Sequence, residues 1–100
     1  LVQLMATNPA HIFGLFPRKG TLQPGSDADM VLYDPNGTRT ITAGTLHGVS
    51  GYTPYEGMPV SGRVRMTISR GRIVYDDGAF PTTGGGHFVP GTPVPPAELP

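Results

Sequence analysis

The sequence predicts a mostly β fold with a short helical segment at its N-terminus. After residue 20, short β-prone runs follow one another, and glycine, proline or asparagine bounds each of them. Helical spacing of apolar residues is confined to the beginning of the chain. The chain has 15 glycines and 12 prolines, and those after residue 81 predict an extended tail. We therefore expect a helical start, a small sheet and a tail.

The first residues are typical of two helical fragments. Residues 1–5 have the partial apolar pattern of a helix tail, and a second short helix is expected to begin near residue 8. Thr7 or Asn8 can cap its free backbone N–H groups, and Pro9 suits its first turn, where a missing N–H costs nothing. Ile12, Phe13 and Phe16 form one apolar face of this helix. Pro17 is expected to end it.

A first hairpin is expected between residues 28 and 42. Residues 28–34 form an apolar run that follows turn chemistry at 20–27. Residues 38–42 are short and β-prone, and the turn-forming residues 35–37 separate the two runs. We expect the second run to pair with the first.

A second hairpin is expected further along the chain. Residues 64–70 alternate apolar and polar side chains with period two, and residues 72–75 do so after Gly71. Before this hairpin, residues 44–62 are rich in glycine and aromatic side chains and predict an ordered loop or a crossing arm. Residues 81–100 predict an extended tail without a core of its own.

Composition excludes several classes of partner. Lys and Arg number 7 and Asp and Glu number 7, so the chain has no net positive charge that would attract nucleic acid or an anionic membrane. No apolar run approaches the roughly 18 residues of a membrane span. The absence of cysteine excludes disulfides and thiolate metal sites and fits a cytoplasmic protein. The uncapped apolar start is typical of an excerpt, and so short a chain is expected to need a partner surface.

The residues do not assemble a recognisable catalytic or metal motif. His11, His47 and His87 lie far apart in sequence, without a second ligand at metal-binding spacing. The acidic pair Asp27 and Asp29 lacks the pattern of a calcium loop, and we expect these carboxylates to bond local backbone N–H groups in a turn. Residues 84–86 lack the Lys-Ser/Thr of a phosphate-binding loop, and no serine or cysteine nucleophile has a base partner.

Aromatic and methionine side chains allow two interpretations. Tyr52, Tyr55 and Phe80, with Met58 and Met66, can line a ligand cleft, but such side chains in a β-rich piece more often form a core or a subunit interface. We therefore expect packing or interface roles, first of all for Tyr52, Pro54, Tyr55, Met58 and Phe88.

An ordered set of motifs resembles a known enzyme family. Residues 7–20 and 24–31 resemble the end of the barrel and the return into the small β-domain of cyclic amidohydrolases. Residues 52–58 and 69–74 are similar to dihydropyrimidinases and hydantoinases in particular. Residues 84–88 resemble their Gly-basic-Gly-x-aromatic ending, with Gly85 in place of the basic residue.

The resemblance implies a place for each part of the chain. Residues 1–19 correspond to the helical end of an amidohydrolase TIM barrel, residues 20–80 to a portion of the β-sandwich (composite) domain that accompanies it, and residues 81–100 to a C-terminal tail. The family implies two divalent metals, usually zinc, bridged by a carboxylated lysine and held by four histidines and an aspartate, which activate water against a cyclic amide. With three histidines and Lys19 as its one lysine, this chain cannot supply that set, so catalytic and metal residues are expected outside it.

Several functions remain open on the sequence alone. The leading hypothesis is a scaffold and assembly segment of a hydantoin- or dihydropyrimidine-hydrolysing enzyme, completed by its own barrel and N-terminal strands and forming a homo-oligomer such as a tetramer. A related allantoinase or dihydroorotase is an alternative, as is a non-catalytic dihydropyrimidinase-like assembly protein. A third class is an independent small β-rich binding module.

Overall fold

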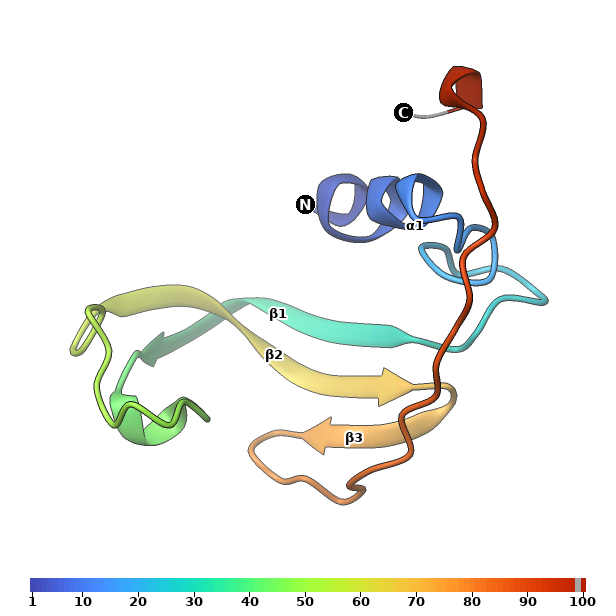
Figure 1. The fold of residues 1–100 in the computed structure, drawn as a ribbon. Helices are drawn as coiled ribbons and strands as arrows, with labels where there is room; N and C mark the ends of the chain where they lie inside the picture. Colours follow the sequence, from blue (N-terminus) through green and yellow to red (C-terminus); the bar gives the residue numbers. More distant parts are fainter. Residues whose placement is uncertain (99) are drawn as a thin grey trace.

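A short helical segment lies over one side of a twisted antiparallel sheet in the computed structural model, which describes residues 1–98 and 100 (Figure 1). Three strands form the described sheet in the order β1-β2-β3: β1 (Met30–Thr40), β2 (Pro59–Ser69) and β3 (Arg72–Asp76). The helical segment comprises a π-helical turn, η1 (Gln3–Thr7), and α1 (Asn8–Ile12). Two 3₁₀ turns, η2 (Ala43–Thr45) and η3 (Pro96–Glu98), complete the elements. The predicted mostly β architecture with a short N-terminal helix is confirmed.

The helical segment is continuous, so the prediction of two fragments with a cap between them was wrong. Thr7 has helical φ and ψ angles of −67° and −53°, and no side-chain cap forms. The Thr7 hydroxyl instead donates to the carbonyl of Gly20, 2.9 Å away. Pro9 is accommodated because the preceding turn is widened: the N–H of Asn8 reaches the carbonyl of Gln3, five residues back.

The helix also ends earlier than the sequence indicated. We expected Pro17 to close it, but α1 ends at Ile12 and Gly14 turns the chain with φ +65°. The N–H groups of Leu15 and Phe16 both reach back to the carbonyl of Ala10, which satisfies a free helix-end acceptor. Glycine permits this left-handed turn at little cost, so it ends the helix before the proline does.

The predicted first hairpin was wrong, because residues 28–42 belong largely to one strand. β1 continues through Pro35, Asn36 and Gly37 and pairs with the distant β2. Asp34 faces Arg63 and Thr38 faces Ser61, so the turn-forming residues are extra residues in a bulge. A local bond from the Asn36 N–H to Asp34 Oδ1, 3.0 Å long, supports this bulge. Turn chemistry is present there, but it bends the strand and does not reverse it.

The second hairpin is confirmed. β2 and β3 pair antiparallel with Ser69 opposite Arg72, so Arg70 and Gly71 form a two-residue turn. Both have positive φ, +47° and +76°, as a type I′ turn requires. β2 begins already at Pro59, so the predicted loop at 44–62 ends earlier than expected.

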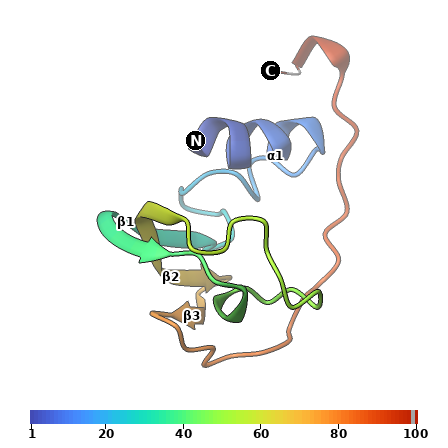
Figure 2. The same ribbon diagram turned by 90° about the vertical axis from the view of Figure 1, so that its left-hand side faces the viewer.

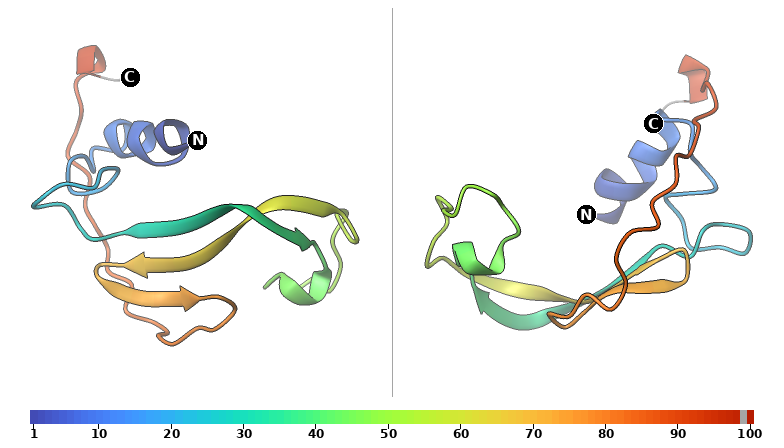
Figure 3. Two further views of the ribbon diagram at one scale, coloured as in Figure 1. Left: turned by 180° about the vertical axis from the view of Figure 1, so that it is seen from behind. Right: turned by 60° about the horizontal axis from the view of Figure 1, so that its bottom comes forward.

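The arm and the tail lie at opposite ends of the sheet. Residues 41–58 connect β1 to β2 and form an arm at one end, which faces the viewer in Figure 2. Residues 81–95 pass the other end and run beside the helix, as both views of Figure 3 show. The N–H of Thr92 donates to the carbonyl of Gly14 at 2.9 Å, which ties the tail to the turn after α1.

The described chain encloses very little core. Ala10, 4% exposed, is the one fully buried hydrophobic residue among those described. The accessible surface is 7539 Å², whereas a compact folded monomer of 10.5 kDa is expected to expose roughly 5,400 Å². The radius of gyration is 16.3 Å, whereas about 13 Å is usual for 100 residues. The described chain is therefore more open than a compact monomer of its size.

Candidate functional site

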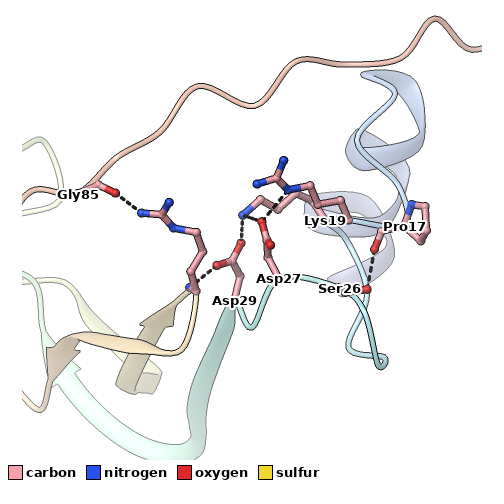
Figure 4. A network of polar contacts seen from close by, with 8 residues as sticks. Pro17, Lys19, Ser26, Asp27, Asp29 and Gly85 are labelled. Atoms are coloured by element: carbon pink, nitrogen blue, oxygen red, sulfur yellow. Dashed lines mark hydrogen bonds and ion pairs between the residues drawn. The ribbon is translucent and has the colours of Figure 1, made fainter.

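A cluster of charged side chains joins the loop after the helix to the start of the sheet (Figure 4). Lys19 Nζ lies 2.9 Å from Asp27 Oδ2 and also donates to Asp29 Oδ2. Arg18 Nε donates to Asp27 Oδ2 over 3.1 Å. Lys19 therefore sits between two carboxylates, one in the loop and one at the entry to β1.

Backbone geometry brings these side chains together. The N–H of Asp27 donates to the carbonyl of Arg18 at 2.9 Å, and Ser26 Oγ donates to the carbonyl of Pro17 at 2.6 Å. These two bonds close the loop over residues 17–27 and hold its first and last residues next to each other. The ion pairs then form across a loop whose shape the backbone has already set.

Asp29 connects the cluster to the turn between β2 and β3. Its Oδ1 accepts the backbone N–H of Arg70, 2.7 Å away, in the turn between β2 and β3. The Arg70 guanidinium in turn donates to the carbonyl of Gly85 in the tail. One connected set of contacts therefore links the helix-end loop, the sheet and the tail.

The ionisation of the cluster follows from these contacts. Hydrogen bonds to Asp29 and then Asp27 raise the pKa of Lys19 above its usual value. Hydrogen bonds from Lys19 and Arg18 lower the pKa of Asp27. For Asp29, partial burial opposes ionisation, but the bonds from Lys19 and from the Arg70 N–H outweigh it and lower the pKa. The charged forms are therefore the stable ones at neutral pH.

The prediction that Asp27 and Asp29 bond local backbone N–H groups was wrong. Asp27 accepts from side chains eight and nine residues away, and Asp29 accepts from Arg70, 41 residues away. Asp34, in β1, makes a local bond of the kind expected for Asp27 and Asp29: it accepts the backbone N–H of Asn36. Bonds to Arg18 and Lys19 join a carboxylate to a cation, so they add attraction between opposite charges that a bond from a neutral backbone N–H lacks.

The three histidines lie at separate places in the fold. His11 stacks on Phe16 with ring centroids 4.0 Å apart, and His47 meets the edge of Phe80 at 5.0 Å. His87 is exposed on the tail. Within residues 1–98 and 100, no group of three or more potential ligands is close enough to hold a metal. With Lys19 engaged by two carboxylates, these residues do not fit a dinuclear metal centre.

The residues predicted for an interface are exposed but do not form one patch. Tyr52, Pro54, Tyr55 and Met58 belong to the arm, and Tyr52 is 74% exposed. Phe88 belongs to the tail and is 91% exposed. The tail passes the other end of the sheet (Figure 1). Phe80 contacts His47 of the arm and Tyr75 of β3, so it packs between these two elements.

Two surface hollows border the charged cluster. One, of about 360 Å³, lies between the helix and the loop and is mostly apolar, with Lys19, Asp27 and Asp29 at its charged side. The other, of about 390 Å³, lies between the β2–β3 turn and the tail; its lining combines basic side chains with Ser69, two valines and the glycines of residues 84–86. Sequence reasoning missed this second place, although Arg70 and Arg72 stood out as part of a motif.

Comparison with known proteins places the chain in a family. The model of the amidohydrolase family matches residues 1–74. The chain belongs to the amidohydrolase family. Among the relatives of this amidohydrolase chain is the dihydropyrimidinase of Rattus norvegicus, which is 48% identical over 93 residues; the match covers 92% of this chain and 18% of the relative. The D-hydantoinase of Ralstonia pickettii is 43% identical over 86 residues, covering 83% of this chain and 19% of the relative.

Solved structures agree with the family assignment. The dihydropyrimidinase from Brevibacillus agri superimposes with a TM-score of 0.75 at 46% identity, over 80% of this amidohydrolase chain and 17% of that protein. The L-hydantoinase from Arthrobacter aurescens gives 0.77 at 39% identity, over 82% of this chain and 18% of that one. The chain thus spans about a fifth of the length of these relatives. None of its described helices has the length and apolarity needed to cross a membrane.

Proposed function

We propose that this chain is the C-terminal scaffold segment of a metal-dependent cyclic amidohydrolase that opens the ring of hydantoins or dihydropyrimidines. In this proposal, the catalytic residues and two divalent metals, zinc in the first instance, belong to the rest of a longer cytoplasmic protein. The observation that carries it is the 48% identity to a dihydropyrimidinase of which the chain spans only 18%. The chain supplies residues 20–80 as part of the β-sandwich domain beside the barrel.

The open shape of the chain supports this role. Large apolar side chains of the helical segment are exposed, with Leu4 at 73%, Met5 at 72% and Phe13 at 69%. Apolar surface of this extent gains free energy when another surface covers it. The surface in excess of a compact monomer is on the order of 2,000 Å², which is more than the roughly 800 Å² that one partner buries in an interface of standard size. Barrel and N-terminal strands of the same longer protein would cover it.

The histidines provide a direct test of where catalysis resides. In the protein at its full native length, we expect the triple variant His11→Ala, His47→Ala, His87→Ala to retain hydantoin and dihydrouracil ring opening within about threefold of the parent kcat, because the proposal places the metal ligands outside this chain. Loss of a true metal ligand is expected to cost far more, on the order of 10²-fold or greater. The measurement is kcat together with bound metal per chain.

Two outcomes would contradict this assignment. If the triple variant lost its metal, this chain would contribute ligands after all. If the full-length protein bound no metal and opened neither ring, it would be a non-catalytic relative. The 100-residue chain with added zinc serves as the negative control and is expected to show no turnover.

We further propose that the arm and the tail join neighbouring subunits of a homo-oligomer, a tetramer in the first instance. Tyr52 and Phe88 support this because both present large aromatic surface to solvent. The arm and the tail lie at opposite ends of the sheet, so each can meet a different neighbour (Figure 1).

Deletion of residues 81–100 from the full-length protein is therefore expected to lower the oligomer size measured by light scattering. Phe88→Ser should act in the same direction without removing the Thr92–Gly14 contact. Leu22→Ser is the matched control, since Leu22 is 70% exposed but lies in neither the arm nor the tail. An unchanged tetramer after the deletion would refute the role of the tail in assembly.

A further inference from the structure

Two arginines meet the tail at a single glycine. The Arg70 guanidinium donates to the carbonyl of Gly85, as the bond at Gly85 in Figure 4 shows. A Cβ placed on Gly85 would lie 2.8 Å from Arg72 Nη1 and 3.9 Å from Arg70 Nη2. Both guanidinium groups therefore border the same small space, and they can do so because residue 85 carries no side chain.

Neither of these arginines has a carboxylate partner among the described residues. Arg18 pairs with Asp27, and Arg63 and Arg65 share Asp77, each within 3.5 Å. No such pair involves Arg70 or Arg72 in the described part of the chain. Two like charges that border one space repel each other, and an anion between them would turn this repulsion into attraction.

The space between them is part of the basic hollow. It measures about 390 Å³ and is lined by the β2–β3 turn and by tail residues, with Lys19, Arg70, Arg72 and His87 among its lining. Lys19 is already neutralised by Asp27 and Asp29, so the two guanidinium groups carry the uncompensated charge. The hollow has the size of a small-ligand site.

The backbone conformation brings the two guanidinium groups to this hollow. Arg70 occupies the left-handed region with φ +47°, where asparagine or glycine is the usual choice for a two-residue turn. Gly85 itself has φ +84°, which disfavours any other residue there. Arg70 and Gly85 thus both occupy the left-handed region where the turn and the tail meet.

We propose that this hollow is a binding site for a phosphate group, held between the guanidinium groups of Arg70 and Arg72. Guanidinium binds phosphate through paired, charge-assisted N–H bonds, and Arg70 keeps further N–H donors besides the one used by Gly85. His87 borders the same space and adds a ring nitrogen. The ligand is either inorganic phosphate or the phosphate of a small monoester, which share this chemistry.

The test is calorimetric titration of the protein at its full native length with inorganic phosphate and with methyl phosphate, at constant ionic strength. Arg70→Asn removes a guanidinium while keeping a residue that tolerates the turn. Arg72→Gln removes the other. We expect each to weaken phosphate binding at least about tenfold, as loss of one charge-assisted contact does. Gly85→Ala should weaken it similarly by displacing Arg72.

Arg39→Gln is the matched control, because Arg39 is an exposed arginine on β1 that lies outside this hollow and carries the same charge. It should leave binding unchanged. Hydrogen exchange of the β2–β3 hairpin verifies that each variant keeps its fold. Tighter binding of methyl phosphate would identify a monoester as the ligand type, and tighter binding of inorganic phosphate the free ion. The proposal is overturned if wild type binds neither compound below about 10 mM, if Arg39→Gln weakens binding as much as Arg72→Gln, or if acetate competes equally.

Discussion

Gly62→Ala is expected to destabilise the pairing of β1 with β2 by roughly 2–3 kcal/mol. Gly62 is buried in β2 with φ +84°, and a Cβ there would lie 1.7 Å from Tyr33 Oη. Tyr33 covers this glycine from the neighbouring strand, and its hydroxyl donates to the carbonyl of Ser61 at 3.4 Å. Alanine would therefore strain the backbone and also displace the tyrosine.

Native-state hydrogen exchange of β1 and β2 amides measures this effect locally, in the protein at its full native length. Gly25→Ala is the matched control, since Gly25 has φ +93° and a Cβ added there would have nothing within 4 Å, and we expect about 1 kcal/mol from strain alone. In a Tyr33→Ala background, Gly62→Ala should cost no more than that control. Equal losses of stability for Gly62→Ala and Gly25→Ala in the parent protein would show that the overlap with Tyr33 does not contribute to the cost.

Asp29→Asn is expected to cost roughly 1–2 kcal/mol at pH 7. The substitution removes the charge that faces Lys19 and weakens the acceptor of the Arg70 N–H. Partial exposure of the cluster holds the cost below that of a fully buried pair. The unfolding midpoint in urea, followed by circular dichroism, measures it.

The cost should depend on pH in a defined direction. Because folding lowers the pKa of Asp29, its stabilisation is present above the unfolded carboxyl pKa of about 3.9 and is lost as pH falls through the lower folded value. Because folding raises the pKa of Lys19, its stabilisation is present below about 10.4 and is lost as pH rises through the folded value. The difference between wild type and Asp29→Asn is thus largest from about pH 5 to 10.

Asp34→Asn provides the control, since Asp34 makes a local bond to Asn36 and takes part in none of the ion pairs among the described residues. Its effect should be small across the same range. A pH-independent cost for Asp29→Asn would show that the carboxylate acts only as a neutral acceptor.

The sequence predicted those parts of the fold that depend on neighbouring residues. The β2–β3 hairpin followed from period-two alternation on both sides of Gly71, because the residues that pair and the turn between them all lie within residues 66–76. The pairing of β1 with β2 was missed, since Met30 faces Ile68 across a long arm. The residue types at 35–37 suit a bulge as well as a reversing turn, so only the distant partner strand decides between the two.

In the site, too, the contacts between residues distant in sequence were the ones that the sequence did not predict. Asp27 and Asp29 were recognised as notable, but their partners depend on how the loop closes and on a turn 41 residues away. The meeting of Arg70, Arg72 and Gly85 depends on the path of the tail, which has no periodic pattern to predict it. The family resemblance, in contrast, rests on short motifs in one order and was confirmed by the comparisons.

The outer strands bear on how such a protein is made. Within the described sheet, β1 and β3 each pair on one side only, and β1 leaves an edge eleven residues long. An open edge of this length is a template on which other chains add. If the segment is C-terminal, as proposed, it leaves the ribosome last, after the N-terminal strands have been synthesised and can pair with it. Synthesis order then protects it from aggregation, and separate expression would remove that protection.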